Sequence, residues 1–309
     1  MNPAIVHCLR AATQVPEQPA VADWWPRWSD GAARAPAPAE MAVLGGFDAD
    51  RVGWAFASGY QAALHALLPV LPRDRIAAFC VTEDGGNRPR DIRTRFTPCP
   101  DGSLTIHGAK RWTTLGPAGC VLLVVGALPT SGPEDRPRLK VARVDAKAPG
   151  VQLLPMPATR FVPEVPHARV QLDEVRVESG AVLPGDGYEA CVKPFRSIED
   201  LHVTLAVLAY LIREARQRGW PVAFAERVCG AMVLLTGLAG EAADAPAMHV
   251  ALAGALALSH GLYDEAAALW AREGDTAAAQ RWARDAALFA VGASARQQRT
   301  QRAWERLSA

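Results

Sequence analysis

Several common signatures of function are missing from this chain of 309 residues. Its six cysteines include no pair at Cys-x-x-Cys spacing, so the sequence offers no zinc or thioredoxin-like motif. None of its seven histidines stands at a metal-ligand spacing such as His-x-x-x-His, and we expect no metal site. The nucleophile elbow Gly-x-Ser-x-Gly and the loop Gly-x-Gly-x-x-Gly are also missing, which argues against a hydrolase of the elbow type and against a Rossmann dinucleotide site.

The chain is equally short of net charge and of long apolar runs. Lysine and arginine total 33 against 32 acidic residues, which leaves no basic surplus for general nucleic-acid binding. The apolar run 203–212 is too short for a membrane span, and the first ten residues lack the pattern of a signal peptide. Half of the residues are apolar, enough for a large core. We expect a soluble cytoplasmic protein with free thiols, without nucleic acid and without a membrane span.

The first compositional segment, residues 1–75, predicts a short N-terminal helical domain. Apolar residues recur at helical spacing from Val52 to Leu67, and Pro69 and Pro72 follow, so we expect one clear helix there. The stretch 32–38 is rich in proline and alanine and is expected to form a loop.

The second segment, residues 76–186, predicts a central antiparallel β-barrel or sandwich. Short apolar or alternating runs follow one another at 76–82, 92–96, 104–107, 120–126, 139–144, 151–154 and 168–172. Turn residues separate them at Pro100-Asp101-Gly102, Ser131-Gly132-Pro133 and Ala148-Pro149-Gly150.

The third segment, residues 187–309, predicts a C-terminal helical bundle. Leucines 201, 205 and 208 form one helical stripe, and similar stripes run through 228–239 and 248–269. Asp275-Thr276 is typical of a helix start, and the basic stretch 296–306 is expected to be a frayed helix. The three segments together predict an α+β fold that is mainly α.

Four motifs stand in a fixed order along the second and third segments. They are Phe79-Cys80-Val81-Thr82-Glu83, Gly108-Ala109-Lys110-Arg111-Trp112-Thr113-Thr114, Val170-Gln171-Leu172-Asp173-Glu174-Val175-Arg176-Val177 and Leu183-Pro184-Gly185-Asp186-Gly187-Tyr188. In order and spacing this series resembles the acyl-CoA dehydrogenase family, over about residues 76–272. The resemblance implies a helical domain, a β-barrel and a helical bundle.

The resemblance also implies a cofactor and a reaction. Members of the family bind FAD and remove the α and β hydrogens of an acyl-CoA thioester, with a carboxylate as the base. By this resemblance Thr82 would lie against the pyrimidine edge of the flavin, Trp112 would pack on the ring system, and the Thr114 hydroxyl would point at N5. From the residues alone, the threonines are also ordinary strand formers and Trp112 an ordinary core residue.

Two departures from the family pattern concern its charged residues. Ala215 stands where the family has an arginine for the FAD pyrophosphate, so Arg216 or Arg218 is expected to substitute, unless both belong to a solvated helix end. Aligning Arg284-Asp285-Ala286 with the family's Arg-Asp-Ala places Ala293 at the catalytic glutamate.

Glu199 falls near a second base position that the family uses, early on the first bundle helix. A carboxylate there, desolvated by flavin and acyl chain, would have a raised pKa suited to taking the α proton. The same residue also fits the acidic first turn, residues 197–200, of a helix interrupted by Pro194.

Three hypotheses follow for the function. The first is an acyl-CoA dehydrogenase-like flavoenzyme that oxidises acyl-CoA or another acyl thioester, with FAD as cofactor, Glu199 as base and a homodimer or homotetramer formed through the bundle. The second is a catalytically lapsed relative that serves as a binding or assembly subunit. The third is a flavin oxidase or monooxygenase of the same fold. The missing glutamate favours the second and third, and the retained Thr82, Trp112 and Thr114 favour the first and third.

Overall fold

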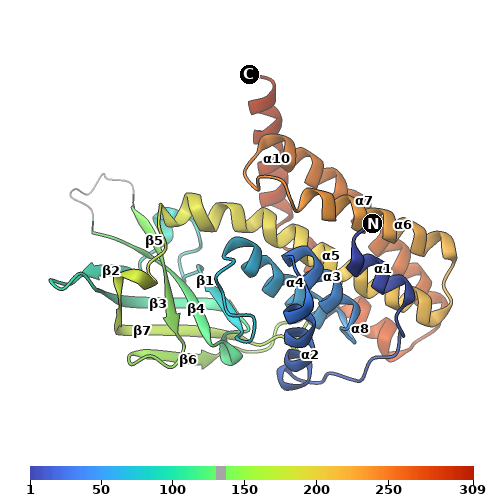
Figure 1. Ribbon diagram of the computed structural model, residues 1–309, viewed down its shortest axis with the longest axis horizontal. Coiled ribbons are helices and arrows are strands. Elements are labelled where there is room, and N and C mark those ends of the chain that lie inside the picture. The colour runs from blue at the N-terminus through green and yellow to red at the C-terminus, as the bar shows by residue number, and fades with distance from the viewer. Residues whose placement is uncertain (130–136) are drawn as a thin grey trace. The chain divides into compact units, whose positions relative to one another are not determined.

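The computed structural model describes residues 1–129 and 137–309 and divides into two compact units. Unit 1 comprises Met1–Val70, Thr159–Glu164 and Phe195–Ala309, and unit 2 comprises Leu71–Ala158 and Val165–Pro194. The N-terminal and C-terminal helices therefore belong to one unit, and the strands belong to the other (Figure 1). The turn expected at Ser131-Gly132-Pro133 lies outside the described residues.

Unit 1 is helical throughout its regular elements. Its helices are α1 (Pro3–Arg10), α2 (Val21–Arg34), α3 (Pro38–Phe47), α4 (Val52–Leu67), α5 (Lys193–Arg218), α6 (Val222–Leu238), α7 (Pro246–Arg272), α8 (Ala277–Asp285), α9 (Ala287–Ala290) and α10 (Ala293–Leu307). The first two residues of α5 are counted with unit 2. Thr276 caps α8 by accepting a hydrogen bond from the Ala279 N–H, as its position in the sequence predicted. Among the residues that the structure describes, every helix is too short or too polar to cross a bilayer.

The first 70 residues hold more helix than the one helix predicted from their sequence. Besides the expected helix, α4, the structure forms α1, α2 and α3. Pro26 lies inside α2, and a sequence with an internal proline does not predict a helix, because proline removes a backbone N–H from the helix interior. The Pro/Ala-rich stretch shrinks to a three-residue connection, and Pro38 begins α3 because a first-turn position needs no N–H donor.

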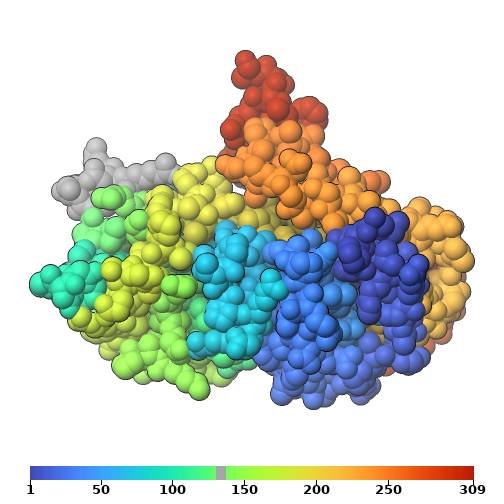
Figure 2. Space-filling view, in the orientation of Figure 1, coloured from blue at the N-terminus to red at the C-terminus, as the bar shows by residue number. Residues whose placement is uncertain are grey.

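Tryptophans hold the N-terminal helices together. Trp24 of α2 stacks on Trp54 of α4 with ring centroids 5.3 Å apart, and its indole N–H donates to the Ser58 hydroxyl at 3.0 Å. Both rings are almost fully buried. In the space-filling view the dark blue surface of α1 borders the light orange surface of α6 (Figure 2). The Arg216 guanidinium near the end of α5 donates to the Cys8 and Ala11 carbonyls of the same N-terminal segment.

Two glycines set the distance between α5 and the N-terminal helices. A Cβ atom added at Gly46 of α3 would meet the Ala206 carbonyl oxygen at 2.1 Å. One added at Gly59 of α4 would meet the Val203 Cα atom at 2.5 Å. Because both obstacles are backbone atoms of α5, no side chain can move aside for a larger residue. The close approach therefore fixes the position of α5 within unit 1.

Part of the connection between β6 (Val151–Pro155) and β7 (His167–Val177), residues 159–164, also belongs to unit 1. The backbone N–H of Val162, a residue with φ +42°, donates to the fully buried Asp285 carboxylate at 2.7 Å. The Arg284 guanidinium pairs with Glu164 at 3.1 Å. Residues 159–164 are thus anchored by the end of α8.

Unit 2 is built on one seven-stranded sheet. Its strands are β1 (Ala77–Cys80), β2 (Arg95–Pro98), β3 (Leu104–Thr114), β4 (Val121–Ala127), β5 (Leu139–Asp145), β6 (Val151–Pro155) and β7 (His167–Val177). Their order is β1-β4-β2-β3-β7-β6, with β5 paired to β4. Each strand overlaps one of the seven apolar runs predicted from the sequence, although β3 and β7 extend well beyond their runs. The interior is filled from alternating positions, with Phe96, Ile106 and Val170 fully buried.

One detail of the sheet differs from the expectation. Although β2–β3, β3–β7, β4–β5 and β6–β7 are antiparallel, β1 pairs with β4 in parallel, and β2 meets β4 in parallel at one position. The sheet is therefore mixed. Alternation of apolar residues reports which face of a strand is buried, but it carries no information on strand direction.

Candidate functional site

Strand β3 carries a strained and exposed tryptophan near its end. Trp112 has a φ of +56°, a region that residues other than glycine rarely adopt. The register of β3 against β7 shifts between Lys110 and Thr113, and such a bulge re-aims the side chain within it. The indole stays 44% exposed, with the edge-on ring of His167 and the Arg111 guanidinium against it. Strain and exposure of this kind are typical of a binding position.

The two threonines predicted with Trp112 are accessible and unpaired. Thr82 follows β1 and Thr114 ends β3, and both are half-buried. Among the described residues, neither hydroxyl has a hydrogen-bond partner, so each is free to donate to a ligand. The Arg111 N–H donates to the Thr82 carbonyl at 2.9 Å, which brings Thr82 alongside β3. By contrast, Thr113 between Trp112 and Thr114 is buried.

A buried ion pair fixes both segments that carry these residues. The Lys110 ammonium lies 2.6 Å from the Glu83 carboxylate, and their side chains are 0% and 6% exposed. Glu83 also accepts the backbone N–H groups of Arg93 and Thr94, at 2.6 and 3.0 Å. Burial acts to raise the pKa of Glu83, but Lys110 and these donors outweigh it and hold that pKa below its usual value. Lys110 in turn donates to the Val81 carbonyl, next to Thr82.

Glu199 is a carboxylate without a partner in the first turns of α5. It is half-buried, and its side chain forms no hydrogen bond or ion pair with any described residue. Burial, assisted by the neighbouring Asp200 charge and opposed by Arg196, raises the pKa of Glu199 to about 8. An acid in this state can take a proton near neutral pH more readily than an ordinary glutamate can.

Asp200, the acid next to Glu199, does have partners. Asp200 accepts hydrogen bonds from Arg296 and Arg299 of α10, at 3.2 and 2.6 Å. These two contacts tie α10 to the start of α5 and occupy the Asp200 carboxylate. Ala293, at the aligned position of the family's glutamate, begins α10 directly after Gly292, and it brings no carboxylate.

The two arginines predicted for the pyrophosphate are both engaged inside unit 1. Arg216 donates to the Cys8 and Ala11 carbonyls at 2.7 and 2.8 Å. Arg218 pairs with Glu214 at 2.6 Å and with Glu273 at 2.5 Å. A phosphate would have to displace these partners.

One group of potential ligand side chains is formed by residues that are far apart in the sequence. His107 on β3 and Asp173 and Glu174 on β7 bring their ligand atoms within 4.8 Å of one another, all exposed. His107 Nδ1 lies 3.3 Å from the Asp173 carboxylate. Spacing along the chain gives no sign of this group, because strand pairing creates it.

Comparisons with known proteins agree with this architecture. No family model and no curated protein matches the sequence. The fold, however, is that of acyl-CoA dehydrogenases and related flavoproteins, as the motif series implied.

Three solved structures illustrate the likeness. An FAD-dependent dehydrogenase is 14% identical with a TM-score of 0.72, over 99% of this chain and 96% of that chain. Butyryl-CoA dehydrogenase from Megasphaera elsdenii is 15% identical with a TM-score of 0.63, over 90% and 85%. The prolyl acyl carrier protein oxidase AnaB is 14% identical with a TM-score of 0.66, over 93% and 92%. At these identities the likeness is one of fold.

Proposed function

We propose that this protein is an FAD-dependent oxidoreductase that removes the α and β hydrogens of an acyl thioester. The observation that carries the proposal is the group at the end of β3. Trp112 is held exposed in a strained conformation, and the accessible hydroxyls of Thr82 and Thr114 have no hydrogen-bond partner in the described part of the chain. A flavin offers what these groups need, namely a flat ring system and polar atoms that accept hydrogen bonds.

Each of these side chains has a separate role toward the cofactor. Thr82 and Thr114 would donate hydrogen bonds to the ring system, and Trp112 would pack against it. Bound FAD would supply the hydride acceptor that no side chain can provide. The Glu83–Lys110 pair would hold both segments in place, since it connects to Val81 on one side and precedes Trp112 on the other.

We assign the base to Glu199. The support for this assignment is its unpartnered carboxylate and its raised pKa, because a general base works best with a pKa near the working pH. Its part in the reaction would be to take the α proton of the thioester on a carboxylate oxygen. Arg216 and Arg218 stay predictions for the FAD pyrophosphate, and each would have to exchange a protein partner for phosphate.

The first test is flavin content. Purified protein reconstituted with FAD is expected to be yellow, with an absorption band at about 450 nm. Trp112→Ala is expected to weaken FAD binding by about tenfold or more, because the ring loses an aromatic contact. Flavin fluorescence during titration measures the affinity. Thr97→Val, an exposed β2 threonine, is the matched control and should leave the affinity unchanged.

The other outcomes separate the remaining hypotheses. A folded but colourless protein that binds no added FAD would contradict the proposal and favour a lapsed binding or assembly subunit. A yellow protein whose colour is bleached by acyl thioesters supports the dehydrogenase. If thioester oxidation also consumes oxygen stoichiometrically, the oxidase alternative is favoured, a class that one fold neighbour represents.

We also propose that the chain forms a homodimer or homotetramer through the helical bundle. Large apolar side chains stand exposed on α6 and α7, among them Val222, Val233, Leu234 and Leu258. Leu258→Glu is expected to shift the mass measured by light scattering toward the monomer, since a charge would be buried at the interface. Val70→Glu, at an equally exposed position after α4, is the control. An unchanged mass for Leu258→Glu would remove this face from the interface.

A further inference from the structure

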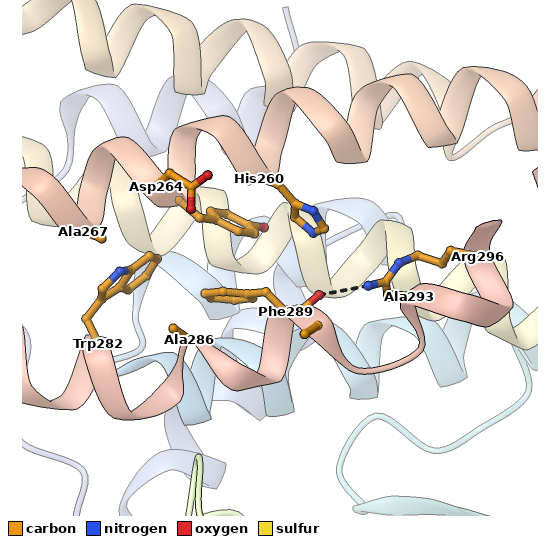
Figure 3. Close-up of a pocket in the computed structure, with 10 residues that line it drawn as sticks. His260, Asp264, Ala267, Trp282, Ala286, Phe289, Ala293 and Arg296 are labelled. Atoms are coloured by element: carbon orange, nitrogen blue, oxygen red, sulfur yellow. Dashed lines mark hydrogen bonds between the residues drawn. The ribbon is translucent and has the colours of Figure 1, made fainter.

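A cleft in unit 1 has no part in the function proposed above. It lies among α7, α8, α9 and α10 and encloses about 360 Å³ (Figure 3). Its aromatic side chains are Tyr263, Trp282 and Phe289. The Phe289 ring lies 4.3 Å from that of Tyr263 and 5.4 Å from that of Trp282, measured between centroids. Tyr263 and Trp282 are buried and Phe289 is half-buried, so the aromatic wall is firmly held.

The cleft exists because the remaining wall positions are small. Alanines stand where a larger apolar residue would fill the space, at 267, 286, 290 and 293. These methyl groups leave the faces and edges of the rings accessible to a flat ligand. The volume suits a compound of one or two fused rings with a short substituent.

Arg296, the one arginine or lysine among the described residues of the lining, is already bonded to other parts of the protein. Arg296 donates to the Phe289 and Val291 carbonyls at 2.9 and 2.7 Å, and to Asp200 at 3.2 Å. Figure 3 shows its guanidinium directed at the Phe289 carbonyl. Asp200 is shared with Arg299, but the three acceptors occupy both terminal nitrogens of the Arg296 guanidinium, and an anionic ligand would have to displace one of them.

The polar groups on the α7 side are not committed. Asp264 and His260 lie four residues apart on α7, on the side of the cleft opposite Phe289 (Figure 3). Asp264 forms no hydrogen bond or ion pair with any described residue. Burial, with the Arg296 charge, lowers the pKa of His260, against the Asp264 and Asp200 charges, which act to raise it. Among the described residues of the lining, Asp264 is therefore the charged side chain that has no protein partner.

We propose that this cleft binds a small aromatic amine. The ring would pack against Phe289 and Trp282, and the ammonium group would pair with Asp264. Aromatic faces attract cations electrostatically, so both features of the wall favour the same charge. An aromatic carboxylate of the same size would meet Asp264 as a like charge and would be rejected.

Three probes with one ring system test the proposal by titration calorimetry on the full chain. Tryptamine carries a cation, indole carries no charge and indole-3-acetate carries an anion. Tryptamine is expected to bind at least about tenfold more tightly than indole, and indole-3-acetate more weakly than indole. Asp264→Asn is expected to remove the preference for tryptamine while leaving indole binding unchanged. Asp244→Asn, an exposed acid elsewhere, is the matched control.

A second variant tests the cavity itself. Ala290→Phe would fill the space beside Phe289 and is expected to abolish binding of tryptamine and indole alike, with an unchanged circular dichroism spectrum. The proposal fails if tryptamine does not bind, if indole-3-acetate binds as tightly, or if Asp264→Asn keeps the preference. If Ala290→Phe does not fold, the Asp264→Asn result still decides the charge preference. None of these readouts depends on flavin, so the result is independent of the proposed oxidoreductase activity.

Discussion

Replacing Lys110 by methionine is expected to lower the free energy of unfolding by about 3–5 kcal/mol at pH 7. The reason is the Glu83 carboxylate, which is 6% exposed and would lose its charged partner at 2.6 Å. Of its present partners, the backbone N–H groups of Arg93 and Thr94 alone would then stabilise the buried negative charge of Glu83. Urea unfolding monitored by circular dichroism measures the change.

The pH dependence of this variant identifies the cause. Without Lys110, the folded-state pKa of Glu83 is expected to rise above its unfolded value, because burial no longer meets an opposing charge. Stability contributed by a raised acid pKa is present at low pH and is lost as pH rises. The loss caused by Lys110→Met should therefore be smaller at pH 5 than at pH 8.

Two further variants complete the comparison. Adding Glu83→Gln to Lys110→Met is expected to recover part of the lost stability, since no unpaired charge remains. Lys193→Met breaks the exposed pair with Glu189, also at 2.6 Å, and should cost no more than about 0.5 kcal/mol. If Lys110→Met costs as little as Lys193→Met, the Glu83–Lys110 pair does not hold the two segments as argued.

The second large effect concerns Glu199. In the FAD-loaded protein, Glu199→Gln is expected to slow bleaching of the flavin by a reactive acyl thioester by about 10²–10⁴-fold, the usual contribution of a general base. Gln has the shape of Glu but cannot accept the α proton. Stopped-flow absorbance at about 450 nm measures the rate. Glu226→Gln, an exposed acid on α6, should bleach like the unaltered protein.

The same experiment has a pH signature. Because the base must be ionised, and the pKa of Glu199 is raised to about 8, the rate should increase with pH up to and through that value. This rise should be missing in Glu199→Gln. Equal rates in the two proteins would show that another group takes the proton.

The fold was readable from the sequence where periodicity was strong. The seven strands of unit 2 follow from apolar alternation and turn residues, and α5 and α7 from long apolar stripes. Helix α2 was missed because Pro26 interrupts its pattern while tertiary packing of Trp24 and Trp28 holds it in place. The direction of β1 against β4 was also out of reach, because side-chain alternation is the same in parallel and antiparallel strands.

The candidate site was readable only as a set of residues. The motifs singled out Thr82, Trp112 and Thr114, but not the positive φ of Trp112, which arises from a bulge in the pairing of β3 with β7. Spacing could not reveal that the guanidinium groups of Arg216 and Arg218 bind partners far away in the sequence, such as the Cys8 carbonyl and Glu273. The cleft containing Asp264 was likewise invisible, because the way in which the consecutive helices α7 to α10 pack, and not a spacing along the chain, forms its walls.

The position of residues 159–164, in the connection between β6 and β7, has a consequence for folding during synthesis. Their anchor, Asp285, lies 123 positions further along the chain than Val162. During synthesis the β6–β7 connection therefore leaves the ribosome long before its carboxylate partner exists. A fragment that contains only the strands of unit 2 and their connections would include residues 159–164 but would lack α8, which these six residues contact. A ribosome stalled before codon 285 is expected to display this connection as a protease-sensitive loop, which becomes resistant once α8 has been translated and has folded.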